Sequence, residues 1–484
     1  MPKKSLASRA LMALALTIGF YALALSIAGG LLFAVYLELV YSNHIYVKAT
    51  LFAVVGAGLI LWSILPRFDR FVAPGPRLDE TSQPDLFALI REVAAATEQP
   101  VPREVYLIPD VNAWVAQRGG MAGIGSRRVM AVGLALLQSL NVDELRAVIA
   151  HEFGHYCGGD TKLGVWVYKT RAAIVRTVNN LGKTGGSMQK PFLWYGTFFL
   201  RVTQAISRAQ EHAADLLAAK VAGARNAINA LVATHRAAAA YTPYWNNEVL
   251  PVLSNGFRPP IAAGLTQFMN DAAIQTELGK FVERELAEGQ GDEYDSHPPL
   301  RERVAALEPL AAGETPAQSP LASTLLRDLE SLEVEVVRNL FTDPAKASTL
   351  TQLDWRDTAS KVYQPMWRSH AVQYAGALRE LNMVGAGDAA TSVLQFAVRL
   401  NLVHIPKEEA AAKAKAVLGC AIATRLMEEG WACNAAPGAP ITLTKDGRTI
   451  APFLAVKRMA SGEMTAAAWA EECAAAGIAE RPLA

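Results

Sequence analysis

The chain has 484 residues, more than one hydrophobic core normally organises, so two or three domains plus any membrane part are expected. Its 46 Lys and Arg residues nearly balance its 45 Asp and Glu residues, which gives no electrostatic reason to expect a nucleic-acid partner. The four cysteines lie far apart and form no Cys-x-x-Cys pair, which argues against a disulfide framework and against a thiolate metal site.

Two apolar runs near the N-terminus predict a hairpin of transmembrane helices over about residues 11–36 and 48–66, within an anchor of residues 1–72. Basic residues precede the first run and follow the second, and only Lys48 lies between the two runs. The positive-inside rule therefore places both flanks, and with them the bulk of the chain, in the cytoplasm. A cleaved secretory signal is the alternative, but such signals have an apolar core of only about 7–15 residues.

Residues 73–310 are expected to form a mainly helical α+β domain. An amphipathic helix is predicted over residues 83–97, and a second strong helix, capped by Asn141 or Asp143, is predicted to run to Tyr156 before Gly158 and Gly159 end it. Three β-prone segments separated by turn residues predict a small antiparallel sheet, and they cover residues 104–108, 112–117 and 128–132.

The second of these helices contains the sequence His151-Glu152-Phe153-Gly154-His155. Residues four apart lie on the same face of a helix, so both imidazoles can bind one cation, with Glu152 beside them. Two neutral histidines suit zinc, which would polarise a peptide carbonyl and acidify a bound water whose proton Glu152 would take. The five-residue pattern also occurs by chance on helix surfaces, so it needs support from elsewhere in the chain.

A catalytic zinc site needs a third protein ligand. In the alanine-rich helical stretch of residues 207–215, Glu211 and Asp215 are four apart, and Arg208 shares their face. Glu211 could bind the metal, while Asp215 could accept a hydrogen bond from a ligand histidine. A solvated helix face is the alternative, and His212 is a rival ligand that points about a quarter-turn away.

These residues resemble the HtpX-like and CAAX-prenyl-protease family of integral-membrane zinc peptidases, which are of the gluzincin type. The resemblance covers about residues 74–310, and four blocks carry it: Asn112-Ala113-Trp114, residues 148–159, residues 207–215 with the pattern Arg-x-x-Glu-x-x-x-Asp, and Ser296-His297-Pro298-Pro299 followed by Arg301 and Arg303. Many members carry two further spans between the histidine motif and the glutamate. Here that interval holds several basic residues, and the apolar segment 192–200 is either interfacial or a buried core helix.

The resemblance implies that His151, His155 and Glu211 bind one catalytic zinc ion, that Glu152 is the general base, and that Asp215, with Arg208 nearby, supports a ligand histidine. It also implies a catalytic role for His297, either stabilising the oxyanion or occupying the open metal position. The expected function is a zinc metalloendopeptidase of the bacterial inner membrane that acts on polypeptides in protein quality control. The alternatives are CAAX-type maturation and a non-catalytic zinc-binding scaffold.

Beyond this domain, an Ala-, Pro- and Gly-rich stretch predicts a linker over residues 311–322. Residues 323–484 are expected to form a mostly helical domain with a β-hairpin around Asp446-Gly447. Four tryptophans in this region are expected in its core: Trp355, Trp367, Trp431 and Trp469. The region shows no ligand set, and a substrate-recruiting or regulatory role is the hypothesis for it.

Overall fold

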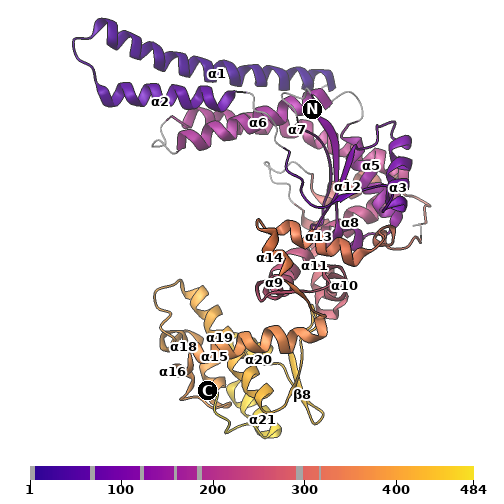
Figure 1. Ribbon diagram of the computed structural model, residues 1–484, viewed down its shortest axis with the longest axis vertical. Coiled ribbons are helices and arrows are strands. Elements are labelled where there is room, and N and C mark those ends of the chain that lie inside the picture. Colours follow the sequence, from indigo (N-terminus) through magenta and orange to yellow (C-terminus); the bar gives the residue numbers. More distant parts are fainter. Residues whose placement is uncertain are drawn as a thin grey trace. The chain divides into compact units, whose positions relative to one another are not determined.

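The chain divides into two compact units, one of residues 1–236 with 280–329 and the other of residues 237–279 with 330–484 (Figure 1). The computed structural model describes residues 6–65, 71–119, 125–156, 161–182, 188–289, 298–315 and 318–484. The second unit thus includes residues 237–279 as well as the C-terminal region. Units defined by contacts need not coincide with domains, so the domain boundaries expected from the sequence stay a prediction.

Two long apolar helices begin the first unit, α1 (Leu6–Tyr41) and α2 (Val47–Ile64), and they pack against each other as a hairpin (Figure 1). By length and composition, residues 11–41 and 47–64 are long and apolar enough to cross a membrane. They are the two candidate spans within the described part of the chain. Their positions match the two apolar runs of the sequence.

Two further helices, α6 (Thr161–Gly182) and α7 (Lys190–Ala222), pack along this hairpin. One shared core joins all four helices and includes Phe20 of α1, Ile60 of α2, Ile174 of α6, and Phe192 and Phe199 of α7. The N-terminal part of α7 is therefore a packed element of a helical bundle.

The segment 192–200 has two different faces. Phe192 and Phe199 are fully buried, whereas Trp194 is 72% exposed and stacks on Phe198. Tyr195 ties the segment to α1, because its hydroxyl donates a hydrogen bond of 2.6 Å to the Leu16 carbonyl. One face thus belongs to the core, and the opposite face carries exposed aromatic side chains.

A four-stranded sheet with the order β1-β2-β4-β3 follows the helical hairpin in sequence, and its strands are β1 (Arg77–Leu78), β2 (Glu104–Ile108), β3 (Ala113–Arg118) and β4 (Arg127–Gly133). The β1–β2 and β3–β4 pairs are antiparallel, but β2 and β4 are parallel. The prediction of an antiparallel sheet is therefore wrong for the central pair. The chain passes from β2 to the edge strand β3 before it returns as β4, and this crossover makes β2 and β4 run in the same direction.

The first unit also contains α3 (Pro84–Ala96), α4 (Leu134–Ser139), α5 (Val142–Gly154), α12 (Leu300–Leu307) and the first part of α8 (Ala224–Tyr244). Asn141 caps α5 in a reciprocal capping box with Glu144. Helix α5 ends at Gly154, two residues before the predicted end, and His155 is its C-cap. Gly158 and Gly159 lie outside the described residues.

The second unit is also mostly helical. Its longest helix, α19, lies at its centre, and the four tryptophans predicted for the core are all buried, as expected. The hairpin of β8 and β9 turns at Asp446-Gly447, where both residues have positive φ, which confirms the predicted tight turn.

The other elements that lie wholly or partly in this unit complete the order of the chain. They are α9 (Leu250–Ser254), β5 (Phe257–Arg258), α10 (Ile261–Asn270), α11 (Ala272–Glu288), α13 (Leu329–Leu340), α14 (Pro344–Ser348), β6 (Thr351–Gln352), α15 (Gln364–Gln373), α16 (Ala375–Leu378), α17 (Gly385–Thr391), α18 (Val393–Arg399), α19 (Lys407–Glu428), β7 (Ala432–Asn434), β8 (Thr442–Lys445), β9 (Arg448–Ile450), α20 (Pro452–Ser461) and α21 (Ala466–Ala476).

Candidate metal centre

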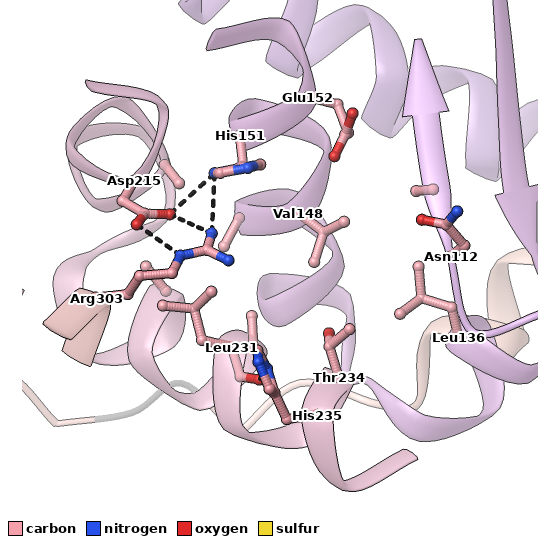
Figure 2. Close-up of a pocket in the computed structure, with 15 residues that line it drawn as sticks. Asn112, Leu136, Val148, His151, Glu152, Asp215, Leu231, Thr234, His235 and Arg303 are labelled. Atoms are coloured by element: carbon pink, nitrogen blue, oxygen red, sulfur yellow. Dashed lines mark hydrogen bonds and ion pairs between the residues drawn. The ribbon is translucent and has the colours of Figure 1, made fainter. Parts of the chain in front are cut away.

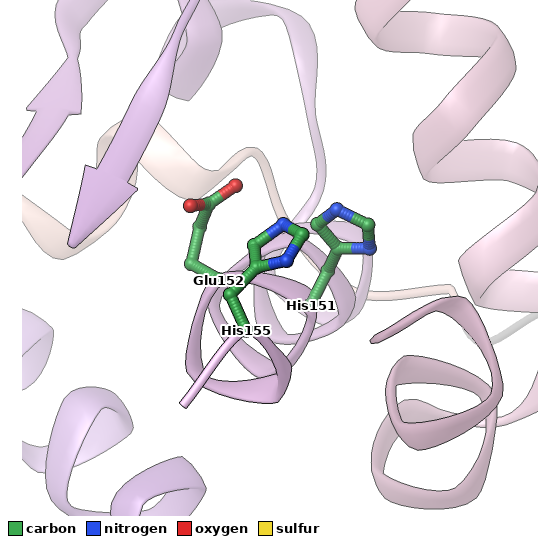
Figure 3. A group of neighbouring side chains, drawn as sticks. All are labelled: His151, Glu152 and His155. Atoms are coloured by element: carbon green, nitrogen blue, oxygen red, sulfur yellow. The ribbon is translucent and has the colours of Figure 1, made fainter. Parts of the chain in front are cut away.

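Helix α5 presents the three polar side chains of the histidine motif together (Figure 3). Its opposite face is anchored in the core, where Ile149 and Phe153 are fully buried. His151, Glu152 and His155 each offer a ligand atom within 4.8 Å of the others, and the two imidazole rings meet edge to face with centroids 4.8 Å apart. One helix therefore brings two nitrogen donors and a carboxylate to one point.

Helix α7 brings a second carboxylate, Glu211, to the same point. Its Oε2 lies 3.4 Å from His151 Nε2, and its Oε1 lies 3.7 Å from His155 Nε2. The two helices cross closely at Gly154, where an added Cβ would lie only 2.8 Å from the Ala214 Cα. A glycine within the histidine motif thus allows α7 to approach α5.

These distances fit a single bound metal ion. Ligands that each lie about 2.0–2.1 Å from a tetrahedral zinc ion are separated by about 3.4 Å. The observed separations of 3.4 and 3.7 Å between Glu211 oxygens and the histidine nitrogens agree with that geometry. His151, His155 and Glu211 can therefore hold a zinc ion as a three-ligand set, and a fourth position would be left for water or substrate.

A buried ion pair lies behind His151 and fixes its orientation (Figure 2). Asp215 Oδ1 lies 2.9 Å from His151 Nδ1, so the carboxylate accepts the Nδ1 proton, and Nε2 is the ring nitrogen that faces Glu211. Arg303 in turn donates two hydrogen bonds to Asp215, of 2.6 and 2.9 Å. Arg303 Nη2 also lies 3.5 Å from His151 Nδ1, but two donors cannot bond to each other.

This arrangement changes the acidity of its members. Burial by itself lowers the pKa of His151, but the hydrogen bonds to Asp215 and Glu211 outweigh it and raise the pKa to about 9. Burial by itself raises the pKa of Asp215, but the hydrogen bonds from Arg303 and His151 lower it below its ordinary value. Asp215 is therefore ionised at neutral pH and attracts positive charge to the site.

The structure places the other predicted residues as follows. Arg208 is half-buried on α7, and the carboxylate of Asp215 is bonded by Arg303 instead, so a supporting role for Arg208 stays a prediction. Among the described contacts, Glu211 rather than His212 approaches both histidines of α5. His297 lies outside the described residues, so its predicted role also stays a prediction.

Arg303 is a site residue that the sequence analysis named in the fourth block of the resemblance but to which it gave no role. It is only 6% exposed on α12, between the buried Leu300 and Leu307. These three residues share one helix face because they are three and four positions apart. An arginine within an otherwise apolar helical stripe was the signal in the sequence that could have marked it as a buried, paired charge.

Two histidines one helical turn apart, a glutamate beside the first, and a carboxylate from a neighbouring helix define a metal-dependent hydrolase, and on this helical scaffold a metallopeptidase.

Comparison with known proteins agrees with this class. Residues 80–311 match the model of peptidase family M48. Protease HtpX of Idiomarina loihiensis (strain ATCC BAA-735 / DSM 15497 / L2-TR) is 29% identical over 211 residues, which cover 39% of this chain and 71% of the relative. No solved structure was found to match the chain. Over residues 80–311 the chain is therefore similar to peptidase family M48, and it resembles an HtpX-like metallopeptidase.

Proposed function

We propose that this chain is a membrane-bound, zinc-dependent endopeptidase in which His151, His155 and Glu211 bind the metal and Glu152 is the general base. The convergence of both histidines on the two carboxylate oxygens of Glu211, at 3.4 and 3.7 Å, carries the proposal. When bound there, zinc supplies Lewis-acid activation of water and of the scissile carbonyl.

The protein groups then divide the remaining work. Glu152 takes a proton from the attacking water and returns it to the leaving nitrogen, since its carboxylate lies beside both histidines. Asp215 accepts the Nδ1 proton of His151, which leaves Nε2 as the nitrogen that would bind the metal. Arg303 holds Asp215 in place and offsets its charge. For His297, the role expected from the sequence, as oxyanion donor or resting-state ligand, remains part of the proposal.

The proposed location is the bacterial inner membrane, with the peptidase site on the cytoplasmic side. Two candidate spans in α1 and α2 and the HtpX relative support a membrane protein. Orientation is argued from charge, because Lys48 is the one basic residue between the spans, whereas several flank them: Lys3, Lys4, Arg9, Arg67, Arg70 and Arg77. Polypeptides at this membrane, including damaged membrane proteins, are the proposed substrates.

The test of catalysis is Glu152→Gln in the purified full-length protein. We expect the variant to bind about one zinc ion, as the wild type does, and to cleave an unfolded protein such as casein at least about a hundredfold more slowly, because general-base catalysis contributes roughly 10²–10⁴-fold. Metal content by mass spectrometry and product formation by gel electrophoresis measure both. Glu302→Gln, an exposed carboxylate of α12, is the control and should change neither. Undiminished cleavage by Glu152→Gln would refute the assignment of Glu152 as the general base.

The test of the ligand set compares Glu211→Ala with His212→Ala. These are neighbouring residues of α7, and the distances of 3.4 and 3.7 Å from the Glu211 oxygens to the two histidines of α5 favour Glu211 as the ligand. We expect zinc to be lost from Glu211→Ala and retained by His212→Ala, with the zinc content measured after dialysis against a weak chelator. The reverse pattern would make His212 the third ligand and overturn the assignment.

A further inference from the structure

The second histidine of the motif lies at the very end of its helix. Helix α5 ends at Gly154, and His155 is the C-cap. The last carbonyl groups of a helix have no partner within it, and helix ends fray. The group that fixes the residue after His155 therefore also fixes this proposed metal ligand.

Tyr156 is that next residue, and it is bonded on two sides. Its hydroxyl donates a hydrogen bond of 2.6 Å to the Val115 carbonyl of β3. Its backbone N–H donates a hydrogen bond of 2.9 Å to the Phe153 carbonyl, which closes the last turn of α5. Tyr156 thus joins the end of the ligand helix to the sheet.

The position of Val115 in the sheet explains why its carbonyl needs this donor. Strand β3 is the last strand in the order β1-β2-β4-β3. The Asn112 carbonyl accepts a hydrogen bond from the Gly133 N–H at the end of β4, so by alternation the Val115 carbonyl faces away from β4. Val115 is only 8% exposed. Without the Tyr156 hydroxyl, a buried carbonyl would be left unsatisfied, which favours movement of β3 or α5.

Arg128 of β4 holds the ring of Tyr156. Its guanidinium carbon lies 4.5 Å from the centre of that ring. The same guanidinium donates hydrogen bonds of 3.3 Å to Gln99 Oε1 and of 3.0 Å to the Pro100 carbonyl, in the connection between α3 and β2. The ring therefore packs against a fixed cation while the hydroxyl is bound at β3.

We propose that Tyr156 is a positioning residue for the metal centre, which holds His155 where it and Glu211 can bind the same ion. The separation that it maintains is 3.7 Å, between His155 Nε2 and Glu211 Oε1. The inference rests on the proposed function, because it takes His155 as a zinc ligand. It goes further by making the contact between α5 and the sheet a determinant of the ligand geometry.

The experiment compares the full-length wild type with Tyr156→Phe, which keeps the ring beside Arg128 and removes the hydroxyl. We expect zinc affinity, measured by competitive chelator titration, to fall about tenfold or more, because groups that orient a metal ligand typically contribute 10–100-fold. The visible absorption spectrum of the cobalt-substituted protein should change as well, since it depends on ligand geometry. Tyr244→Phe is the matched control, because this hydroxyl of the second unit donates to the Ile261 carbonyl at 2.7 Å, and it should change neither quantity.

Thermal unfolding of the zinc-free proteins shows whether each variant is folded. A merely structural role would lower the unfolding temperature of Tyr156→Phe but leave its zinc affinity and cobalt spectrum unchanged, and that result would refute the inference.

If Tyr156→Phe does not fold, Arg128→Gln replaces it. This change removes the cation beside the ring and should lower zinc affinity about two- to fivefold, the usual contribution of such a contact. Unchanged affinity in folded Arg128→Gln would count equally against the inference. A wild type that binds no zinc would instead refute the proposed function, so the two failures are distinguishable.

Discussion

Arg303 is buried against Asp215 although it is two residues from the exposed Arg301 on the same short helix. Its two hydrogen bonds to Asp215 hold the carboxylate that orients His151. Its Nη2 also lies 3.7 Å from Glu211 Oε2, so Arg303 acts as a positioning residue through the two carboxylates. A buried carboxylate without its cation would lose both charge compensation and a fixed direction.

We expect Arg303→Leu to lower the free energy of unfolding by about 3–5 kcal/mol, because it leaves Asp215 buried without its partner. Zinc affinity should fall by roughly 10–100-fold, the usual effect of losing a group that orients a ligand. Thermal unfolding and competitive zinc titration measure the two effects. Arg301→Leu is the matched control, since that side chain is exposed and donates a hydrogen bond to the Ala287 carbonyl. Equal zinc affinity of Arg303→Leu and the wild type would refute the positioning role.

Single residues also show how much of this site could be predicted from the sequence. The four-residue spacings of His151 with His155, and of Glu211 with Asp215, are sufficient to put each pair on one helix face. Spacing along one helix says nothing about a partner that arrives from another helix 88 residues later, as Arg303 does for Asp215. That pairing depends on how α7 and α12 pack.

At the scale of elements, the crossing of α5 and α7 brings the ligand set together. The helices lie close together at Gly154, where an added Cβ would come within 2.8 Å of the Ala214 Cα and 3.0 Å of the Ala214 Cβ. A main-chain atom cannot move aside as the end of a flexible side chain can. A side chain at this position must therefore push the two helices apart, and Glu211 moves with α7.

We expect Gly154→Ala to destabilise the protein by about 1–3 kcal/mol through overpacking. Zinc affinity should fall as well, because the Glu211 carboxylate is drawn away from both histidines. The control is Gly279→Ala in α11, where nothing lies within 4 Å of the new Cβ and the change should be neutral or stabilising by about 0.5–1 kcal/mol. Thermal unfolding with and without zinc distinguishes the variants. Gly154→Ala with normal zinc affinity would show that the helix separation is not critical.

The elements themselves were largely predictable, whereas their pairing was not. Alternating and β-branched residues marked all three longer strands to within about a residue, and β2 was predicted with its observed bounds. A strand's residue pattern reports which faces are buried and carries no information about its neighbour. The parallel pairing of β2 with β4 results from the path of the chain through the edge strand β3.

At the scale of the whole molecule, the N-terminal hairpin is part of a folded bundle and not a simple tether. Phe192 and Phe199 of α7 are buried in a core shared with Phe20 and Ile60 of the hairpin. The same continuous helix carries Glu211. At 1.5 Å per residue, Glu211 lies about 18 Å beyond Phe199 along the helix axis. The N-terminal hairpin and the candidate metal centre are thus joined by one continuous helix.

Deleting residues 1–65 should therefore yield a chain that aggregates in buffer and stays dispersed only in detergent, because the apolar faces of α6 and α7 lose their cover. If the hairpin were only a flexible tether, the chain without residues 1–65 would instead be soluble in buffer. Size-exclusion chromatography with light scattering separates these outcomes. In the full-length chain, Phe192→Ala should destabilise the bundle by about 3–5 kcal/mol, whereas Leu193→Ala, at a 43% exposed neighbouring position, should cost far less. A monodisperse, zinc-loaded and active truncated protein in the absence of detergent would show that the hairpin is dispensable for the fold and serves only to attach it.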